Sequence, residues 1–316
     1  MSHTPPLDAP PRAQRRPTVR IHHGDEVVDD YEWLRDAEDP ATLAHLEAEN
    51  AFADAATDHL EPLRQTIFEE IKARTQETDL SVPVRRAGWW YYTRTVEGSQ
   101  YAIRCRCPVV DTDSWTPPDL SAPESGGDQI VGEQVLLDSN VEAEGHEFFS
   151  LGAFSVSDDE NLLAWSVDTT GDERYTIRIK DLRTGEVLPD EITGASAGAT
   201  WSASSDGTPS HLFYTTVDDA WRPHRVWRHA LGGGTDDVLV HEETDERYFV
   251  GVGRTHSEKY LLIGLSSKVT SEYRVLEADR PEGEFRVVLP RRDGVEYSVE
   301  HAVLGDDDVF LVLHND

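Results

Sequence analysis

Apolar positions near the start of the chain follow a helical period. Asp39 is a good helix N-cap, Pro40 stands at the first helical position, and Pro62 restarts the pattern. The apolar residues that share a face are Leu43, Leu46, Ala53, Ala56 and Leu60 in the first helix, and Leu63, Ile67, Phe68 and Ile71 in the second. The pattern predicts an N-terminal arm over residues 1–38 and two helices over residues 39–76, the second ending near Arg74.

The period changes after Thr78. From Val82 onward the chain consists of short runs rich in Val, Ile, Tyr, Trp and Thr, separated by turns of Asp, Gly and Ser. Typical runs are Trp89–Thr93, Tyr101–Cys105, Leu162–Ser166 and Arg225–Arg228. The pattern predicts an all-β region over residues 77–316.

The predicted strands repeat at a fixed spacing. Strands that follow a polar turn are centred on Trp165, Tyr214, Ile263 and Leu311, which are 49, 49 and 48 residues apart. The next strand of each unit repeats the 49-residue step at Ile177, Val226 and Val275. An earlier unit with Tyr91 and Ile103 fits if about 25 residues are inserted, and the stretch Pro108–Gly132 is the obvious place for that loop. A period near 50 with about four strands per unit indicates the blades of a β-propeller.

The repeat divides the region into blades at about 77–147, 148–198, 199–246 and 247–296, with the start of the next at 297–316. About four and a half blades cannot close a ring, so an open propeller would expose strand edges. We therefore expect an incomplete propeller that forms the front part of a longer protein.

Charge narrows the possible partners. The 316 residues carry a formal net charge of −32, which argues against nucleic acid or an anionic membrane surface and favours cationic ligands. No run approaches the roughly 18 apolar residues of a membrane span, and residues 1–24 lack the apolar core of a signal peptide. A cytoplasmic protein is expected.

Neither cysteines nor histidines form a recognisable metal site. Cys105 and Cys107 stand two apart in a predicted strand, so we expect two reduced packing residues on one face. The pairs His146-Glu147 and His241-Glu242 each lack the second histidine of a zinc-protease helix. The sequence predicts no metal and no cofactor.

One short motif matches a hydrolase signature. Gly194-Ala195-Ser196-Ala197-Gly198 fits G-x-S-x-G, whose serine needs a buried strand before it and a helix after it. Here the repeat places a crossing between two blades at this point, so we interpret Ser196 as a false match. The acidic clusters 158–160, 218–219 and 306–308 fall at predicted turns, where we expect solvated side chains rather than cation sites.

Several longer motifs together resemble the prolyl oligopeptidase family of serine peptidases, and within it the oligopeptidase B group. They are His23-Gly24 through Asp30–Asp36, Glu144–His146 with Phe149–Gly152, Asp168–Tyr175, Trp221–His224 with Val226-Trp227, Val250–Arg254 and Gly294–Tyr297. The resemblance implies a seven-bladed propeller that caps an α/β-hydrolase domain, with the N-terminal helices packed on that domain. It also implies cleavage of short cationic peptides after Arg or Lys.

The same resemblance puts the catalytic Ser, Asp and His, and the acidic residues that receive the basic side chain, beyond Asp316. No catalytic residue is therefore predicted within this chain, and the C-terminal hydrolase domain is its expected partner. Asp172, Glu173 and Arg174 are candidates for contacts with that domain or for lining the path of cationic peptides.

Two other functions remain open from the residues alone. A noncatalytic propeller that binds a peptide or protein is the main alternative, and a propeller hydrolase with its own central metal site is a weaker one. The sequence does not determine the oligomeric state or the precise peptide preference.

Overall fold

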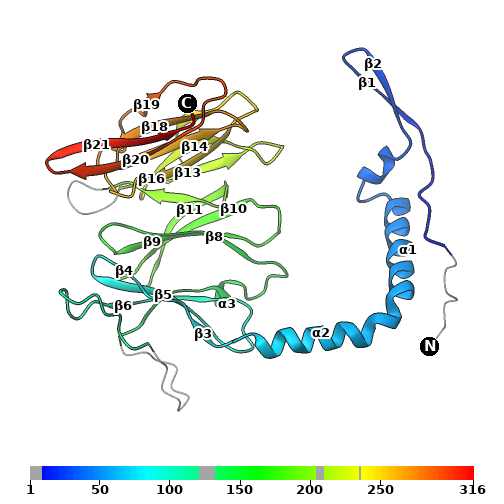
Figure 1. The fold of residues 1–316 in the computed structure, drawn as a ribbon, viewed down its shortest axis with the longest axis horizontal. Coiled ribbons are helices and arrows are strands. Elements are labelled where there is room, and N and C mark those ends of the chain that lie inside the picture. The colour runs from blue at the N-terminus through cyan, green and yellow to red at the C-terminus, as the bar shows by residue number, and fades with distance from the viewer. Residues whose placement is uncertain (1–8, 121–131, 204–209, 235) are drawn as a thin grey trace. The chain divides into compact units, whose positions relative to one another are not determined.

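The computed structural model describes residues 9–120, 132–203, 210–234 and 236–316. The chain divides into two compact units, Met1–Glu77 and Thr78–Asp316 (Figure 1). The first unit combines a two-stranded hairpin with two helices, and the second is built from antiparallel sheets.

The hairpin of the first unit was not predicted from the sequence. Strands β1 (Thr18–His22) and β2 (Asp25–Asp29) pair in antiparallel register around a two-residue turn. Both turn residues, His23 and Gly24, have positive φ angles of 51° and 87°, as tight hairpin turns require. The predicted arm therefore contains regular structure, and the His-Gly pair between two β-branched runs was the signal for it.

The two predicted helices are confirmed. After the 3-10 turn η1 (Glu32–Arg35), helix α1 spans Pro40–Thr57, the turn η2 spans Asp58–Leu60, and helix α2 spans Glu61–Arg74. The side chain of Asp39 accepts a hydrogen bond from the backbone N–H of Ala41 at 2.8 Å, which satisfies one of the free donors at the helix start.

In the described part of the second unit there are four larger sheets and a final hairpin, and Figure 1 shows the first sheet, the second sheet and the remaining strands following one another in chain order. The first sheet contains β3 (Asp79–Leu80), β4 (Val84–Arg86), β5 (Trp89–Thr95), β6 (Ile103–Pro108) and β7 (Gln134–Asp138). The second contains β8 (Ser150–Val156), β9 (Leu162–Asp168), β10 (Tyr175–Asp181) and β11 (Val187–Ala195). The third contains β12 (Ala199–Trp201), β13 (His211–Val217), β14 (Pro223–Ala230) and β15 (Val238–Glu242). The fourth contains β16 (Phe249–Arg254), β17 (Tyr260–Ser266), β18 (Ser271–Glu277) and β19 (Arg286–Leu289), and the hairpin pairs β20 (Tyr297–Leu304) with β21 (Asp307–His314).

The 49-residue repeat is confirmed strand by strand. The residues Trp165, Tyr214, Ile263 and Leu311 lie in the second strands β9, β13, β17 and β21. The residues Ile177, Val226 and Val275 lie in the third strands β10, β14 and β18. A one-turn helix, α3 (Ser139–Glu142), interrupts the otherwise all-β region, and the Asp138 carboxylate caps it by accepting from the N–H of Asn140.

Within the part of the chain that the structure describes, three hydrophobic clusters lie between successive sheets, and a fourth lies on the first sheet, where Trp90 and Ile103 pack with Leu120. One cluster joins the second sheet to the third through Ile177, Ile192, Trp201 and Leu212, and others join the first to the second and the third to the fourth. All seven residues of β9 are buried, as expected for a strand covered on both faces. A sheet that buries both faces depends on its neighbours, which is how radially stacked blades gain their stability.

The remaining predictions about this unit have mixed outcomes. Cys105 and Cys107 are free and buried, as predicted. Of the predicted insertion Pro108–Gly132, residues 109–120 contain no strand and residues 121–131 lie outside the described residues. Among the described residues, no helix is long and apolar enough to cross a lipid bilayer.

Candidate functional site

The loop between β9 and β10 carries the three residues singled out in the sequence. Asp168, at the end of β9, is 2% exposed, and its carboxylate accepts hydrogen bonds from the backbone N–H groups of Thr170 (2.8 Å), Gly171 (2.9 Å) and Glu173 (2.9 Å). Burial alone would raise the pKa of the Asp168 carboxyl, but these donors outweigh it and hold the pKa below its ordinary value. The loop is therefore organised around a buried, ionised carboxylate.

Asp172 and Arg174 are held against the next sheet. The Asp172 carboxylate accepts from the Thr170 hydroxyl at 2.8 Å and from the Arg174 N–H at 3.1 Å, and these bonds lower its pKa. The Arg174 guanidinium lies 4.8 Å from the ring centroid of Trp221, and the Trp221 indole N–H donates to the Asp172 carbonyl at 2.7 Å. Glu173 has a positive φ of 58° and is exposed.

The structure thus shows Asp172 and Arg174 contacting the third sheet. It does not test the predicted contact of these residues with a hydrolase domain or a peptide. Sequence reasoning named Trp221 only as part of a family motif and missed its contact with Asp172 and Arg174, although Trp221 follows Asp172 by 49 residues, one repeat of the strand pattern. The equivalent hairpins of neighbouring units could have been paired on that spacing alone.

A buried arginine ties the hairpin of Trp221 to the crossing between the third and fourth sheets. The Arg222 side chain donates to Asp218 at 2.9 Å and to the carbonyls of Tyr248 at 3.0 Å and Asp245 at 3.3 Å. Trp221 itself is 47% exposed. Its positive φ of 58° is unusual for a bulky aromatic residue. Arg222 therefore holds an exposed aromatic side chain in a conformation it would otherwise rarely adopt.

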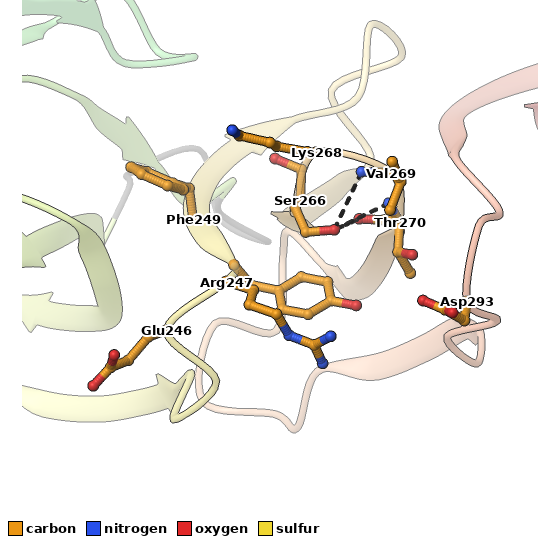
Figure 2. A pocket seen from close by; sticks show the side chains of 10 residues that line it. Glu246, Arg247, Phe249, Ser266, Lys268, Val269, Thr270 and Asp293 are labelled. Atoms are coloured by element: carbon orange, nitrogen blue, oxygen red, sulfur yellow. Dashed lines mark hydrogen bonds between the residues drawn. The ribbon is translucent and has the colours of Figure 1, made fainter. Parts of the chain in front are cut away.

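A pocket of about 510 Å³ is lined in part by this crossing. Its walls come from residues 246–249, the hairpin 266–270 and Asp293. Figure 2 shows Phe249 and Lys268 on one side of the pocket and Asp293 across from Phe249. The hydroxyl of Ser267 accepts from the N–H of Thr270 at 3.1 Å and so shapes the hairpin wall.

One charged side chain that lines the pocket, Arg247, forms a close ion pair. Arg247 is fixed by Asp245, with the closest N–O distance 2.7 Å, and this contact raises the pKa of Arg247 and lowers that of Asp245 to about 2. Phe249 and Val269 line the pocket, are both 55% exposed and provide an apolar surface. The arrangement is suited to an apolar group flanked by charge, and it contains no nucleophile paired with a base.

Ser196 lies where the repeat predicted it, in the crossing from β11 to β12, with a strand rather than a helix after it. Its hydroxyl contacts the carbonyl of Thr215 at 3.2 Å and the Thr215 hydroxyl, and no histidine contacts it among the described residues. A nucleophile elbow needs a histidine within hydrogen-bond reach. The observed contacts join the second sheet to the third.

One carboxylate of each acidic cluster forms an ion pair, which adds to the expectation of solvated side chains. Asp158, in the turn between β8 and β9, contacts Arg254 of β16 at 2.6 Å and Arg86 of β4 at 3.5 Å, so it links three sheets. Asp218 binds Arg222, and Asp308 binds Lys259 at 2.7 Å. Arg222 stands in the same hairpin as Asp218, whereas Arg86, Arg254 and Lys259 belong to other sheets, where a turn pattern cannot reveal them. In the described ranges, no group of three or more His, Cys, Asp and Glu side chains is arranged to hold a metal ion.

Comparison with known proteins identifies the fold. Residues 10–316 match the family described as "Prolyl oligopeptidase, N-terminal beta-propeller domain". Among curated proteins, dipeptidyl aminopeptidase BI of Pseudoxanthomonas mexicana is 42% identical over 305 residues, which are 94% of this chain and 40% of that protein. Protease 2 of Moraxella lacunata is 33% identical over 309 residues, 97% of this chain and 42% of that protein.

Solved structures agree with this result. Oligopeptidase B from Trypanosoma brucei, in a closed form with covalently bound antipain, superposes with a TM-score of 0.81 at 31% identity and covers 97% of this chain and 42% of its own. Oligopeptidase B from Leishmania major gives 0.79 at 27% identity, with 98% and 45% covered. The chain spans about two fifths of the length of the curated relatives named above.

Proposed function

This chain belongs to the prolyl oligopeptidase family, and on that basis we propose that the protein carrying it is a serine peptidase that cleaves short peptides after Arg or Lys. The observation that carries the proposal is the match to the family's propeller over residues 10–316, together with the likeness to protease 2 and to oligopeptidase B. The catalytic residues would then be supplied by a hydrolase domain outside this chain.

In this proposal the sheets of residues 77–316 are blades of a seven-bladed propeller that limits access to short peptides. The apolar faces of α1 and α2 would pack on the hydrolase domain, which accounts for side chains such as Phe68 and Ile71, exposed by 57% and 61%. The net charge of −32 would attract cationic peptides, and Asp172, Glu173 and Arg174 would lie on their path or against the hydrolase domain.

A second activity is supported by a specific observation. The relative with 42% identity is named a dipeptidyl aminopeptidase, which removes dipeptides from free amino ends, whereas cleavage after a basic residue does not require a free amino end. The alternative of a noncatalytic binding module is not favoured, because the relatives named above are peptidases.

The native protein that carries this chain distinguishes these possibilities. Its intact mass should exceed 35.4 kDa, and it should hydrolyse an N-blocked Arg anilide at least about a hundredfold faster than the matching Glu anilide. Hydrolysis of unblocked dipeptide anilides alone would favour dipeptide release, and no hydrolysis of either would refute the peptidase proposal.

Two controls sharpen this assay. The Ser196→Ala variant should retain full activity, because Ser196 is proposed to be structural. Activity toward the Arg substrate should fall as salt rises, since electrostatic steering is screened.

A further inference from the structure

A buried histidine bridges two carboxylates at the junction of the second and third sheets. His229 on β14 is 1% exposed, and its Nδ1 lies 2.7 Å from Asp237 Oδ1 while its Nε2 lies 3.0 Å from Asp190 Oδ1. Asp190 belongs to β11 of the second sheet, whereas Asp237 precedes β15 of the third. The side chains of Asp190 and Asp237 are only 4% and 13% exposed.

Both carboxylates already accept hydrogen bonds from other donors. The Gly232 N–H donates to Asp190 Oδ1 at 2.7 Å, and the Tyr214 hydroxyl donates to Asp237 Oδ2 at 2.6 Å. Burial, reinforced by the Asp237 hydrogen bond, raises the pKa of Tyr214, so this phenol keeps its proton. A ring nitrogen that faces an ionised carboxylate must carry a hydrogen, so an imidazole held between two ionised carboxylates requires its doubly protonated form.

We propose that Asp190, His229 and Asp237 form a charged staple in which a doubly protonated imidazolium ties the second sheet to the third, so that this junction weakens as pH rises. The inference goes beyond the proposed function, because it concerns the assembly of the propeller whatever the enzyme cleaves.

The surroundings of the ring account for the direction of the effect. His229 contacts Asp190 from β11 and Asp237 from the β14–β15 loop; Tyr214 from β13 donates to Asp237, and His211 from β13 lies close enough to feel the charge of His229. Burial and then the charge of Arg228 lower the pKa of His211, so that ring adds little competing charge near neutral pH. Loss of the His229 proton would leave a ring lone pair facing a buried carboxylate, which is costly.

The direction in which pH changes the stability of the junction follows from proton linkage between the folded and unfolded states. A histidine in an unfolded chain is half protonated at about pH 6.5. Because the staple holds its proton in the folded state, its contribution is fully present below that pH and is lost as pH rises and the buried ring gives up its proton.

Hydrogen exchange of the native full-length protein tests the staple. After correction for the chemical exchange rate, amide protection in Val187–Ala195 should fall at least about tenfold between pH 6 and pH 9. In His229→Gln the protection should be low at both values, whereas the matched control His211→Gln should behave like the native protein. Protection that is independent of pH in the native protein, or unchanged in His229→Gln at pH 6, would overturn the proposal.

A second measurement does not depend on how well a variant folds. Deuterium exchange at the imidazole C2 position reports ring protonation of each histidine by mass spectrometry. In the native protein at pH 8, where an ordinary histidine is mostly neutral, the His229 ring should still be protonated. A neutral ring at that pH would refute the staple.

Discussion

The loop that presents Asp172, Glu173 and Arg174 should depend on one carboxylate. Replacing Asp168 by Ala removes the acceptor of three backbone N–H groups and of the Thr170 hydroxyl, which contacts the same carboxylate at 3.1 Å. The strand β9 should persist, because its core contacts are made by other residues. The expected effect is local opening of the loop.

The size of the effect follows from the bonds lost. A hydrogen bond contributes about 1 kcal/mol net, and somewhat more when the acceptor is ionised, but the exposed loop lets water replace part of each bond. Three backbone bonds therefore amount to about 3 kcal/mol, which corresponds to roughly a hundredfold loss of amide protection. Thr170→Ala removes only hydroxyl bonds and should cost about 1 kcal/mol.

Hydrogen exchange with mass spectrometry on the native protein measures both variants. Peptides that cover residues 169–174 should lose protection in Asp168→Ala, while peptides of β13 in the third sheet remain protected. The reasoning would be refuted if Asp168→Ala changed loop protection no more than Thr170→Ala does, because Asp168 would then not organise the loop.

Three further predictions concern acid stability, thiol reactivity and the junction between sheets. The folded-state pKa of Asp168 lies below its ordinary value, so its contribution to stability is present above about pH 4 and is lost as pH falls through the folded value. Loop protection should therefore fall between pH 5 and pH 2 in the native protein but not in Asp168→Asn. Burial raises the pKa of Cys105 to about 12, so iodoacetamide at pH 8 should leave it unmodified until the protein unfolds; rapid labelling of the native protein would contradict this. Trp201 is 1% exposed and donates to the Ser155 carbonyl at 2.9 Å, so Trp201→Ala should destabilise the junction of the second and third sheets by about 3–5 kcal/mol and Trp201→Phe by less; equal protection of β12 in both variants would argue against it.

Local signals accounted for the elements and their repetition. The helix at Pro40–Thr57 and the recurrence of Trp165, Tyr214 and Ile263 follow from the spacing of apolar residues and from capping, which act over a few neighbouring positions. The hairpin at residues 18–29 escaped notice because its apolar side chains are exposed and its turn depends on only His23 and Gly24.

Contacts across sheets could not be derived in the same way. Arg254 and Asp158 are 96 residues apart, and His229 and Asp190 are 39 apart, yet each pair is in direct contact. Nothing in a turn sequence distinguishes an acidic residue that faces water from one that binds a distant arginine. The partner of Arg174 was an intermediate case, because Trp221 occupies the equivalent hairpin one repeat later.

The sequence by itself determined that this protein is built from repeated four-stranded units behind two helices, because strand period, turn chemistry and repeat length are all written in neighbouring residues. Only the tertiary structure decided which charges are paired, which groups Ser196 contacts, and where a buried histidine meets two carboxylates. The physical reason is that successive sheets bury faces against one another, the second and third on both sides, so the environment of a side chain is set in large part by residues about one repeat away.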